Sequence, residues 1–157
     1  MPSKTDRTRL TENEQKWTKP LWAAGWTAFP SVLLERQQAI GLDPLDLNIL
    51  LQLARYWFFA GNVPFPSKKA LAECIGVDVS TIRKRISKME AHGLIRRQQR
   101  YGAKGGGQQS NRYHFDGLIK AATPFAEELI EERKQRKAED AARRTRRGPK
   151  KPIGKRR

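Results

Sequence analysis

The stretch ALAECIGVDVSTIRKRISKMEAHGLIRR, residues 70–97, predicts two helices joined by a tight turn. Gly76 stands where the chain must turn, and glycine adopts the left-handed conformation of such a turn without strain. Asp78 is a good N-cap for a second helix over residues 79–92, which Gly93 ends. This order of short helix, glycine turn and longer basic helix dominates the fold that we expect.

The second helix divides into two chemically different faces. Val79, Ile82, Ile86 and Met89 recur at three- and four-residue spacing and form an apolar stripe. The opposite side is polar and basic, with Ser80, Thr81, Arg83, Lys84, Ser87 and Lys88. This division predicts a helix that packs on protein with its back and presents cations at its front.

A central helix is expected before this stretch. Asp43 and Pro44 are a good cap and first-turn residue for LDLNILLQLARYWFFA, which runs to Ala60. Phe58 and Phe59 widen its apolar face, so we expect this helix at the centre of the core.

Two shorter helices are expected on either side of the central one. The first covers residues 31–39 and ends at Gly41. The second begins after Ser67 and places Cys74 among its inward apolar side chains.

A hairpin and a further helix are expected after the basic helix. Strands over residues 94–101 and 110–115 flank the glycine-rich loop GAKGGGQQ. From Asp116 the chain becomes helical again, with an apolar edge to Ile130 and a possible restart at Thr123-Pro124. That edge either packs on the same core or forms a dimer seam.

The two ends of the chain have unusual compositions. Residues 1–16 are polar and predict a flexible N-terminus. WTKPLWAAGWTAFP, residues 17–30, holds three of the four tryptophans and predicts a lid over the core, with a base-stacking platform as the alternative. A short strand over residues 25–29 is compatible with this segment. Residues 131–157 predict a charged helix end and a disordered basic tail, which from residue 143 holds nine basic residues and no acidic one.

The net charge of +16 indicates a polyanionic partner, either nucleic acid or an acidic membrane surface. The excess is uneven. Residues 1–66 carry a net +1, residues 67–116 carry +7 and residues 117–157 carry +8. The basic character therefore begins with the stretch that holds the two helices and their glycine turn.

Several classes of protein are disfavoured by the composition. No apolar run approaches the ~18–20 residues of a membrane span, and the N-terminus lacks the apolar core of a secretion signal. One cysteine permits no internal disulfide, and one Cys with His92 and His114 does not make a zinc cage. We therefore expect a cytoplasmic, nucleoid-associated protein without metal, cofactor or catalytic residues.

The order of elements over residues 44–115 resembles a winged helix-turn-helix domain. Residues 70–97 carry the resemblance, since GLI leads from the basic helix into the wing. SNRY, residues 110–113, is similar to helix-turn-helix proteins encoded on phages, plasmids and other mobile elements. The implied fold is mostly α with a small β-hairpin, and the domain with its helical extensions spans residues 17–130.

The resemblance implies a DNA-reading surface. Residues 79–92 would be the recognition helix in the major groove, the preceding helix would grip the phosphate backbone, and the wing, including Arg96, would follow a phosphate strand or enter the minor groove. The expected DNA-binding residues are Ser67, Lys68, Lys69, Ser80, Thr81, Arg83, Lys84, Ser87, Lys88, Arg97, Arg100, Lys104 and Arg112.

The expected function is sequence-specific binding of double-stranded DNA by a transcriptional repressor of a bacterium or mobile element, with a homodimer as one arrangement. A plasmid or phage replication initiator is the first alternative. A nuclease is disfavoured because no suitable carboxylate pattern stands out. An adaptor or RNA-binding protein that works through the basic tail is the remaining alternative.

Overall fold

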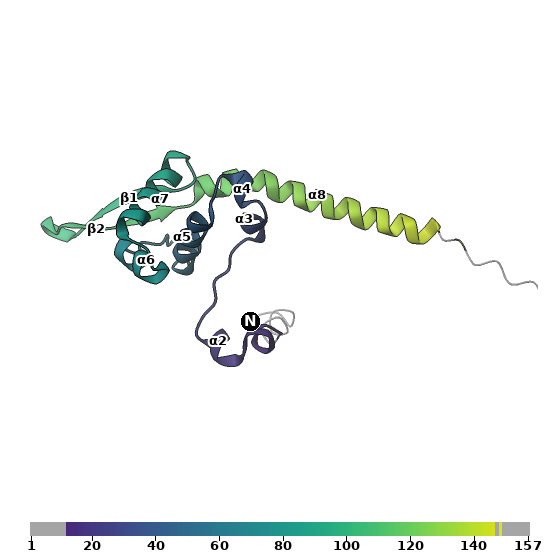
Figure 1. Ribbon diagram of the computed structural model, residues 1–157, viewed down its shortest axis with the longest axis horizontal. Helices are drawn as coiled ribbons and strands as arrows, with labels where there is room; N and C mark the ends of the chain where they lie inside the picture. The colour runs from purple at the N-terminus through teal and green to yellow at the C-terminus, as the bar shows by residue number, and fades with distance from the viewer. Residues whose placement is uncertain (1–11, 147, 149–157) are drawn as a thin grey trace, which may run out of the picture.

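The computed structural model describes residues 12–146 and residue 148 (Figure 1). Residues 12–17 are helical. The elements that follow are α2 (Lys19–Ala23), α3 (Ser31–Glu35), α4 (Gln37–Ile40), α5 (Pro44–Arg55), α6 (Lys68–Ile75), α7 (Val79–Ala91), β1 (Arg96–Tyr101), the 3-10 turn η1 (Ala103–Gly105), β2 (Gln108–His114) and α8 (Asp116–Arg146).

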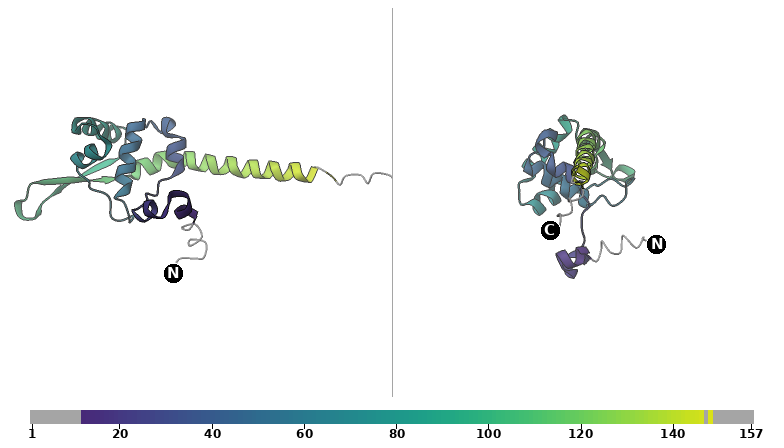
Figure 2. Two further views of the ribbon diagram at one scale, coloured as in Figure 1. Left: turned by 60° about the horizontal axis from the view of Figure 1, so that its bottom comes forward. Right: turned by 90° about the vertical axis from the view of Figure 1, so that its right-hand side faces the viewer.

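The helices α3 to α7 form a bundle, from which the hairpin and α8 extend in opposite directions (Figures 1 and 2). Ile49, Leu50 and Leu53 of α5 are almost completely buried at its centre. Ile82 and Ile86 of α7 are fully buried against the same core. Helix α5 is therefore the predicted central helix. Its apolar stripe packs in the same core as α7, the candidate recognition helix.

The turn between α6 and α7 has the predicted geometry. Ser67 Oγ accepts a hydrogen bond of 3.0 Å from the backbone N–H of Ala70 and so caps α6. Gly76 ends α6 at φ 79°, in the left-handed region that favours glycine. Asp78 occupies the N-cap position of α7 with extended backbone, although its side chain makes no capping bond.

The hairpin is a two-stranded antiparallel sheet with β1 paired to β2. The pairs Arg97–Tyr113 and Gln98–Arg112 fix its register, and an irregularity follows Gln98. Tyr113 is buried, and its backbone N–H donates to the carbonyl of Pro64 at 2.9 Å. The base of the wing is thereby attached to the connector between α5 and α6.

The start of α8 packs closely on the end of α7. A Cβ at Gly117 would collide with the backbone carbonyl oxygen of Gly93, so the two backbones approach too closely for any larger residue. The helix then runs for 31 residues through Pro124 without a break, and the predicted restart at Thr123-Pro124 is wrong. Leu118 and Ala122 lie in the core, whereas the second half of α8 projects beyond the bundle (Figure 2).

Several local predictions are wrong. The central helix ends at Arg55, and Phe58 and Phe59 are 76% and 74% exposed instead of widening its apolar face. Two short helices, α3 and α4, replace the single helix over residues 31–39 because the backbone leaves helical geometry at Arg36. Cys74 is exposed, since α6 turns Leu71 and Ala72 inward instead.

The terminal segments also differ from expectation. Residues 19–23 of the tryptophan-rich segment form α2, and residues 25–29 form no strand. The segment is not a core lid because Trp17 and Trp26 are more than half exposed. Of the predicted flexible N-terminus, residues 1–11 lie outside the described part of the chain, and residues 12–16 are helical. Residues 143–146, expected in the disordered tail, are the last turn of α8, whereas residues 147 and 149–157 lie outside the described part.

Candidate nucleic-acid interface

The outer face of α7 is polar and open to solvent. Ser80, Arg83, Lys84 and Ser87 are exposed, and Thr81 is half-buried. The ion pairs formed among the described residues include neither Arg83 nor Lys84. Both cations of this face are therefore accessible to a polyanion.

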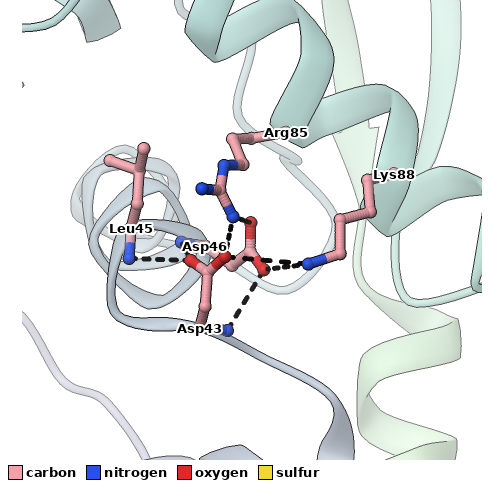
Figure 3. A network of polar contacts seen from close by, with 5 residues as sticks. All are labelled: Asp43, Leu45, Asp46, Arg85 and Lys88. Atoms are coloured by element: carbon pink, nitrogen blue, oxygen red, sulfur yellow. Dashed lines mark hydrogen bonds and ion pairs between the residues drawn. The ribbon is translucent and has the colours of Figure 1, made fainter.

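Four charged side chains fix the rear of α7 to the start of α5 (Figure 3). Asp43 caps α5 by accepting bonds of 2.9 Å from the N–H groups of Leu45 and Asp46, and Asp46 accepts one of 3.1 Å from the N–H of Asp43. Arg85 of α7 forms an ion pair with Asp43, and Lys88 Nζ lies 3.4 Å from Asp46 Oδ2 and 3.7 Å from Asp43 Oδ2. We call these four residues the clamp.

The clamp changes the role expected of Lys88. Burial raises the pKa of the Asp46 carboxyl, and the neighbouring Lys88 ammonium opposes this rise. Lys88 is thus engaged with α5, although it was predicted as a DNA contact. Arg85 was missed because nothing in the local pattern reveals that Asp43 and Asp46, about forty residues earlier, meet α7.

A second group of cations gathers where α6, α7 and β1 meet. Lys68 is half-buried at the start of α6, and its pKa is lowered first by burial and then by the charges of Arg97 and Arg83. The charges of Arg83 and Arg97 therefore both disfavour the charged form of Lys68. Like charges held together are favourable only when an anion is near, so this group is a candidate phosphate site.

Glu90 compensates part of that positive charge from within the protein. Arg97 Nε donates to Glu90 Oε2 at 2.6 Å, and the Arg97 N–H donates to Glu90 Oε1 at 3.2 Å. These bonds from Arg97 lower the pKa of Glu90. Arg97, a predicted DNA contact, is thus held by a carboxylate that joins α7 to β1.

The wing presents its cations in different ways. Arg112 and Lys104 are exposed, and Lys104 stands at the tip with φ 51°. The Arg100 guanidinium lies 4.1 Å from the centre of the Phe65 ring and 3.5 Å from the carbonyl of Ser110, so it is half-covered. The guanidinium of Arg96, which is exposed, lies 3.7 Å from Asp116.

A polar hollow separates the wing from the start of α6. It has a volume of about 270 Å³ and is lined by Ser67, Lys68, Gln108, Gln109, Ser110 and Asn111, together with Pro66 and Tyr113. Sequence reasoning identified Ser67 and Lys68 but not the strand residues, whose amides line the hollow only because the hairpin folds beside α6. Lys69, also predicted, is exposed and lies 3.9 Å from Glu73.

The described residues contain neither a candidate metal site nor a candidate membrane span. Across residues 12–146 and 148, no three His, Cys, Asp or Glu side chains gather in a way that could hold a metal ion. No helix in the same residues has both the length and the apolar character needed to cross a bilayer.

Comparison with protein families identifies the central part of the chain. Residues 41–95, which span α5, α6 and α7, match the model of a helix-turn-helix domain. A comparison with curated proteins finds no significant match.

The solved structures that align with this chain have low sequence identity. The N-terminal domain of DnaD protein from Geobacillus kaustophilus HTA426 aligns with a TM-score of 0.51 at 20% identity, over 79% of this chain and 96% of that one. A possible transcriptional regulator from Methanosarcina mazei Go1 gives 0.41 at 21% identity, over 63% and 82% of the two chains. The transcriptional regulator PA3341 gives 0.39 at 20% identity, over 87% and 92%.

The chain therefore carries a winged helix-turn-helix domain, as the order of its elements predicted. The family match covers α5 to α7, and the hairpin of β1 and β2 that follows is the wing. Helix-turn-helix domains bind DNA, and the match supports DNA binding by this chain.

Proposed function

We propose that the protein binds double-stranded DNA in a sequence-specific manner, with α7 in the major groove. The observation that carries this proposal is the division of α7 into a buried apolar face and an exposed face with Arg83 and Lys84. Arginine and lysine donate to guanine edges, and serine and threonine bond to bases or phosphates.

The remaining contacts would go mainly to phosphates. Ser67, Lys68 and Lys69 lie at the start of α6, and Lys104 and Arg112 are exposed on the wing. Arg100 is available in part. Lys88 and Arg97 would act indirectly, because Asp46 and Glu90 hold them and they thereby position α7 and β1.

The biological role that we propose is transcriptional repression by occupation of an operator, in a bacterium or on a mobile element. Protection mapping on DNA that flanks the protein's own gene tests it, with random duplex as competitor. One protected operator that overlaps a promoter supports repression. Repeated protected sites at a replication origin would favour an initiator, and equal binding to random duplex would refute sequence-specific recognition.

The ionic character of the binding provides an independent test. If six to ten phosphates are contacted, the affinity should fall by roughly 10³–10⁵ between 50 and 200 mM salt. Deletion of residues 143–157 should reduce this salt-sensitive affinity and leave the sequence preference unchanged. A loss of all binding on deletion would instead favour an adaptor or RNA-binding protein that works through its tail.

We also propose that two copies bind together. Two recognition helices of a symmetric dimer would read half-sites about 34 Å apart, one turn of the DNA. The stoichiometry of the complex on a single operator, measured by sedimentation, tests this arrangement.

A further inference from the structure

An N-terminal arm, residues 12–27, leaves large apolar side chains exposed to solvent. Trp17, Leu21 and Trp26 are 56%, 61% and 59% exposed, and α2 buries no residue. Trp22 stacks on Trp26 with 5.4 Å between the ring centroids. An extended segment joins the arm to the bundle (Figure 1).

The bundle has an apolar groove of about 250 Å³ between α3, α5 and α8. The side chains that line it include Leu33, Ala54, Trp57, Phe115, Ala122 and Ala126. A cavity of roughly 150 Å³ already accepts benzene, so this groove accommodates at least one large aromatic side chain. Ile119, on its rim, is 52% exposed.

The arm does not fill this groove within its own chain. Trp22 and Trp26 border an adjoining hollow of about 390 Å³ at the end of α5, next to Trp57 and Phe58. Ala28, Ala54 and Trp57 line both this hollow and the groove. The segment of residues 28–30, which follows the arm, itself forms part of the groove wall. The arm would therefore have to reverse direction within a few residues to enter the groove of its own copy.

We propose that the arm of each copy lies in the groove of a second copy. Such a reciprocal exchange satisfies both unpartnered surfaces at once and closes with two-fold symmetry. Aromatic side chains bury about 150–250 Å² each. With the exposed parts of Trp17, Leu21 and Trp26 on each arm and the facing groove walls, the exchange buries on the order of 1,000 Å², the lower end of the range for a specific interface.

The exchange leaves the DNA-reading surface free. The residues that line the groove come from the segments around α3, α5 and α8 and from Phe115, and none belongs to α6, α7 or β1. The inference specifies the surface of the dimer proposed above, but it concerns the protein without DNA. Its failure is therefore distinguishable from failure of DNA binding.

Sedimentation equilibrium of the full chain without DNA tests the exchange. The wild-type protein should be a dimer, and the double variant Trp17→Ser/Leu21→Ser should raise the dimer dissociation constant at least about a hundredfold, because it removes two central anchors. Neither side chain is buried in the bundle, so the variant should fold. Phe59→Ser is the control: Phe59 is 74% exposed, more than either arm residue, but lines neither hollow.

The identity of the groove's occupant is tested by disulfide trapping. The exposed Cys74 is replaced by serine, and Lys16→Cys on the arm is combined with Thr123→Cys in the groove. Oxidation should produce a disulfide between two chains that requires both new cysteines. A disulfide within one chain, a monomeric wild type, or a dimer that the arm variant leaves intact would each overturn the exchange, whether or not the protein binds its operator.

Discussion

The Lys88 ammonium of α7 lies 3.4 Å from a carboxylate oxygen of Asp46, a completely buried residue of α5. The helix that presents Arg83 and Lys84 is therefore oriented by charged contacts at its rear as well as by apolar packing. Arg85 strengthens the same connection through Asp43. A change in α5 should consequently alter the position of the recognition surface.

Replacement of Asp46 by alanine should destabilise the protein. The variant loses the bond that Asp46 accepts from the Asp43 N–H and leaves Lys88 with a single carboxylate partner. We expect the free energy of unfolding to fall by about 1–3 kcal/mol, measured by urea denaturation. Asp46→Asn, which retains an acceptor oxygen, should lose less, and an equal loss in the two variants would contradict the role of this bond.

The stability should depend on pH through Glu90. Its pKa is lowered in the folded protein by the bonds from Arg97, so its ionised form stabilises the fold above the unfolded pKa near 4.5. That contribution is lost as the pH falls through the lower folded value. Glu90→Gln should therefore reduce the free energy of unfolding at neutral pH, and this effect should diminish as the pH falls below the unfolded pKa.

Asp46 should show the opposite pH dependence and serves as the control. Its pKa is raised by burial, so the folded protein takes up this proton before the unfolded chain does, and the contribution of Asp46 becomes more favourable on acidification. Unfolding curves of Glu90→Gln and Asp46→Asn at several pH values measure both effects. The assignment would be refuted if the loss of unfolding free energy relative to the wild type changed with pH in the same direction for both variants.

Lys68 should be unfavourable for stability and favourable for DNA binding. Burial and the nearby charges of Arg97 and Arg83 lower its pKa, which means that the charged form is disfavoured in the free protein. Lys68→Met should raise the melting temperature and weaken DNA binding by about 1 kcal/mol at low salt. Lys69→Met, which removes an exposed lysine beside it, is the matched control for stability.

Arg83 and Lys84 should differ from the wing in their effect on specificity. Arg83→Ala or Lys84→Ala should cost about 1–3 kcal/mol on the operator and less on random duplex if the side chain reads a base. Arg112→Ala should weaken both DNAs to the same extent, because a phosphate contact carries no sequence information. Fluorescence anisotropy on the two duplexes measures the difference.

A control for charge alone accompanies these variants. Lys120 is an exposed lysine of α8, outside the recognition helix and the wing. Lys120→Ala should weaken binding to the operator and to random duplex equally, and only by the small amount that the loss of one positive charge causes. A sequence-selective effect of Lys120→Ala would show that the reading surface is not α7.

The helix-turn-helix elements were predictable because their signals are local. Caps and glycines at Ser67, Gly76 and Gly93 mark the ends of α6 and α7 within a few residues, and the three- and four-residue spacing of Ile82, Ile86 and Met89 identifies the buried face. The hairpin followed from a glycine-rich loop between two short strands. The exposed position of Arg83 and Lys84 agrees with the same periodicity.

Predictions failed where a residue's surroundings depend on distant parts of the chain. Apolar character at Trp17, Trp26, Phe58 and Phe59 suggested burial, yet no other element of the described chain covers these side chains enough to bury them. Cys74 was assigned to the core from its neighbours, but α6 turns a different side of the helix inward.

Short-range patterning in the amino acids is thus enough for the winged helix-turn-helix domain and for the outward cations of its second helix. Folding alone joins Asp43 and Asp46 to Arg85 and Lys88, brings Lys68, Arg83 and Arg97 together, and leaves the apolar groove open beside α8. The physical reason is that helix caps and periodicity act over one or two turns. Ion pairs and cavities depend instead on how separate elements pack, which spacing along the chain does not encode.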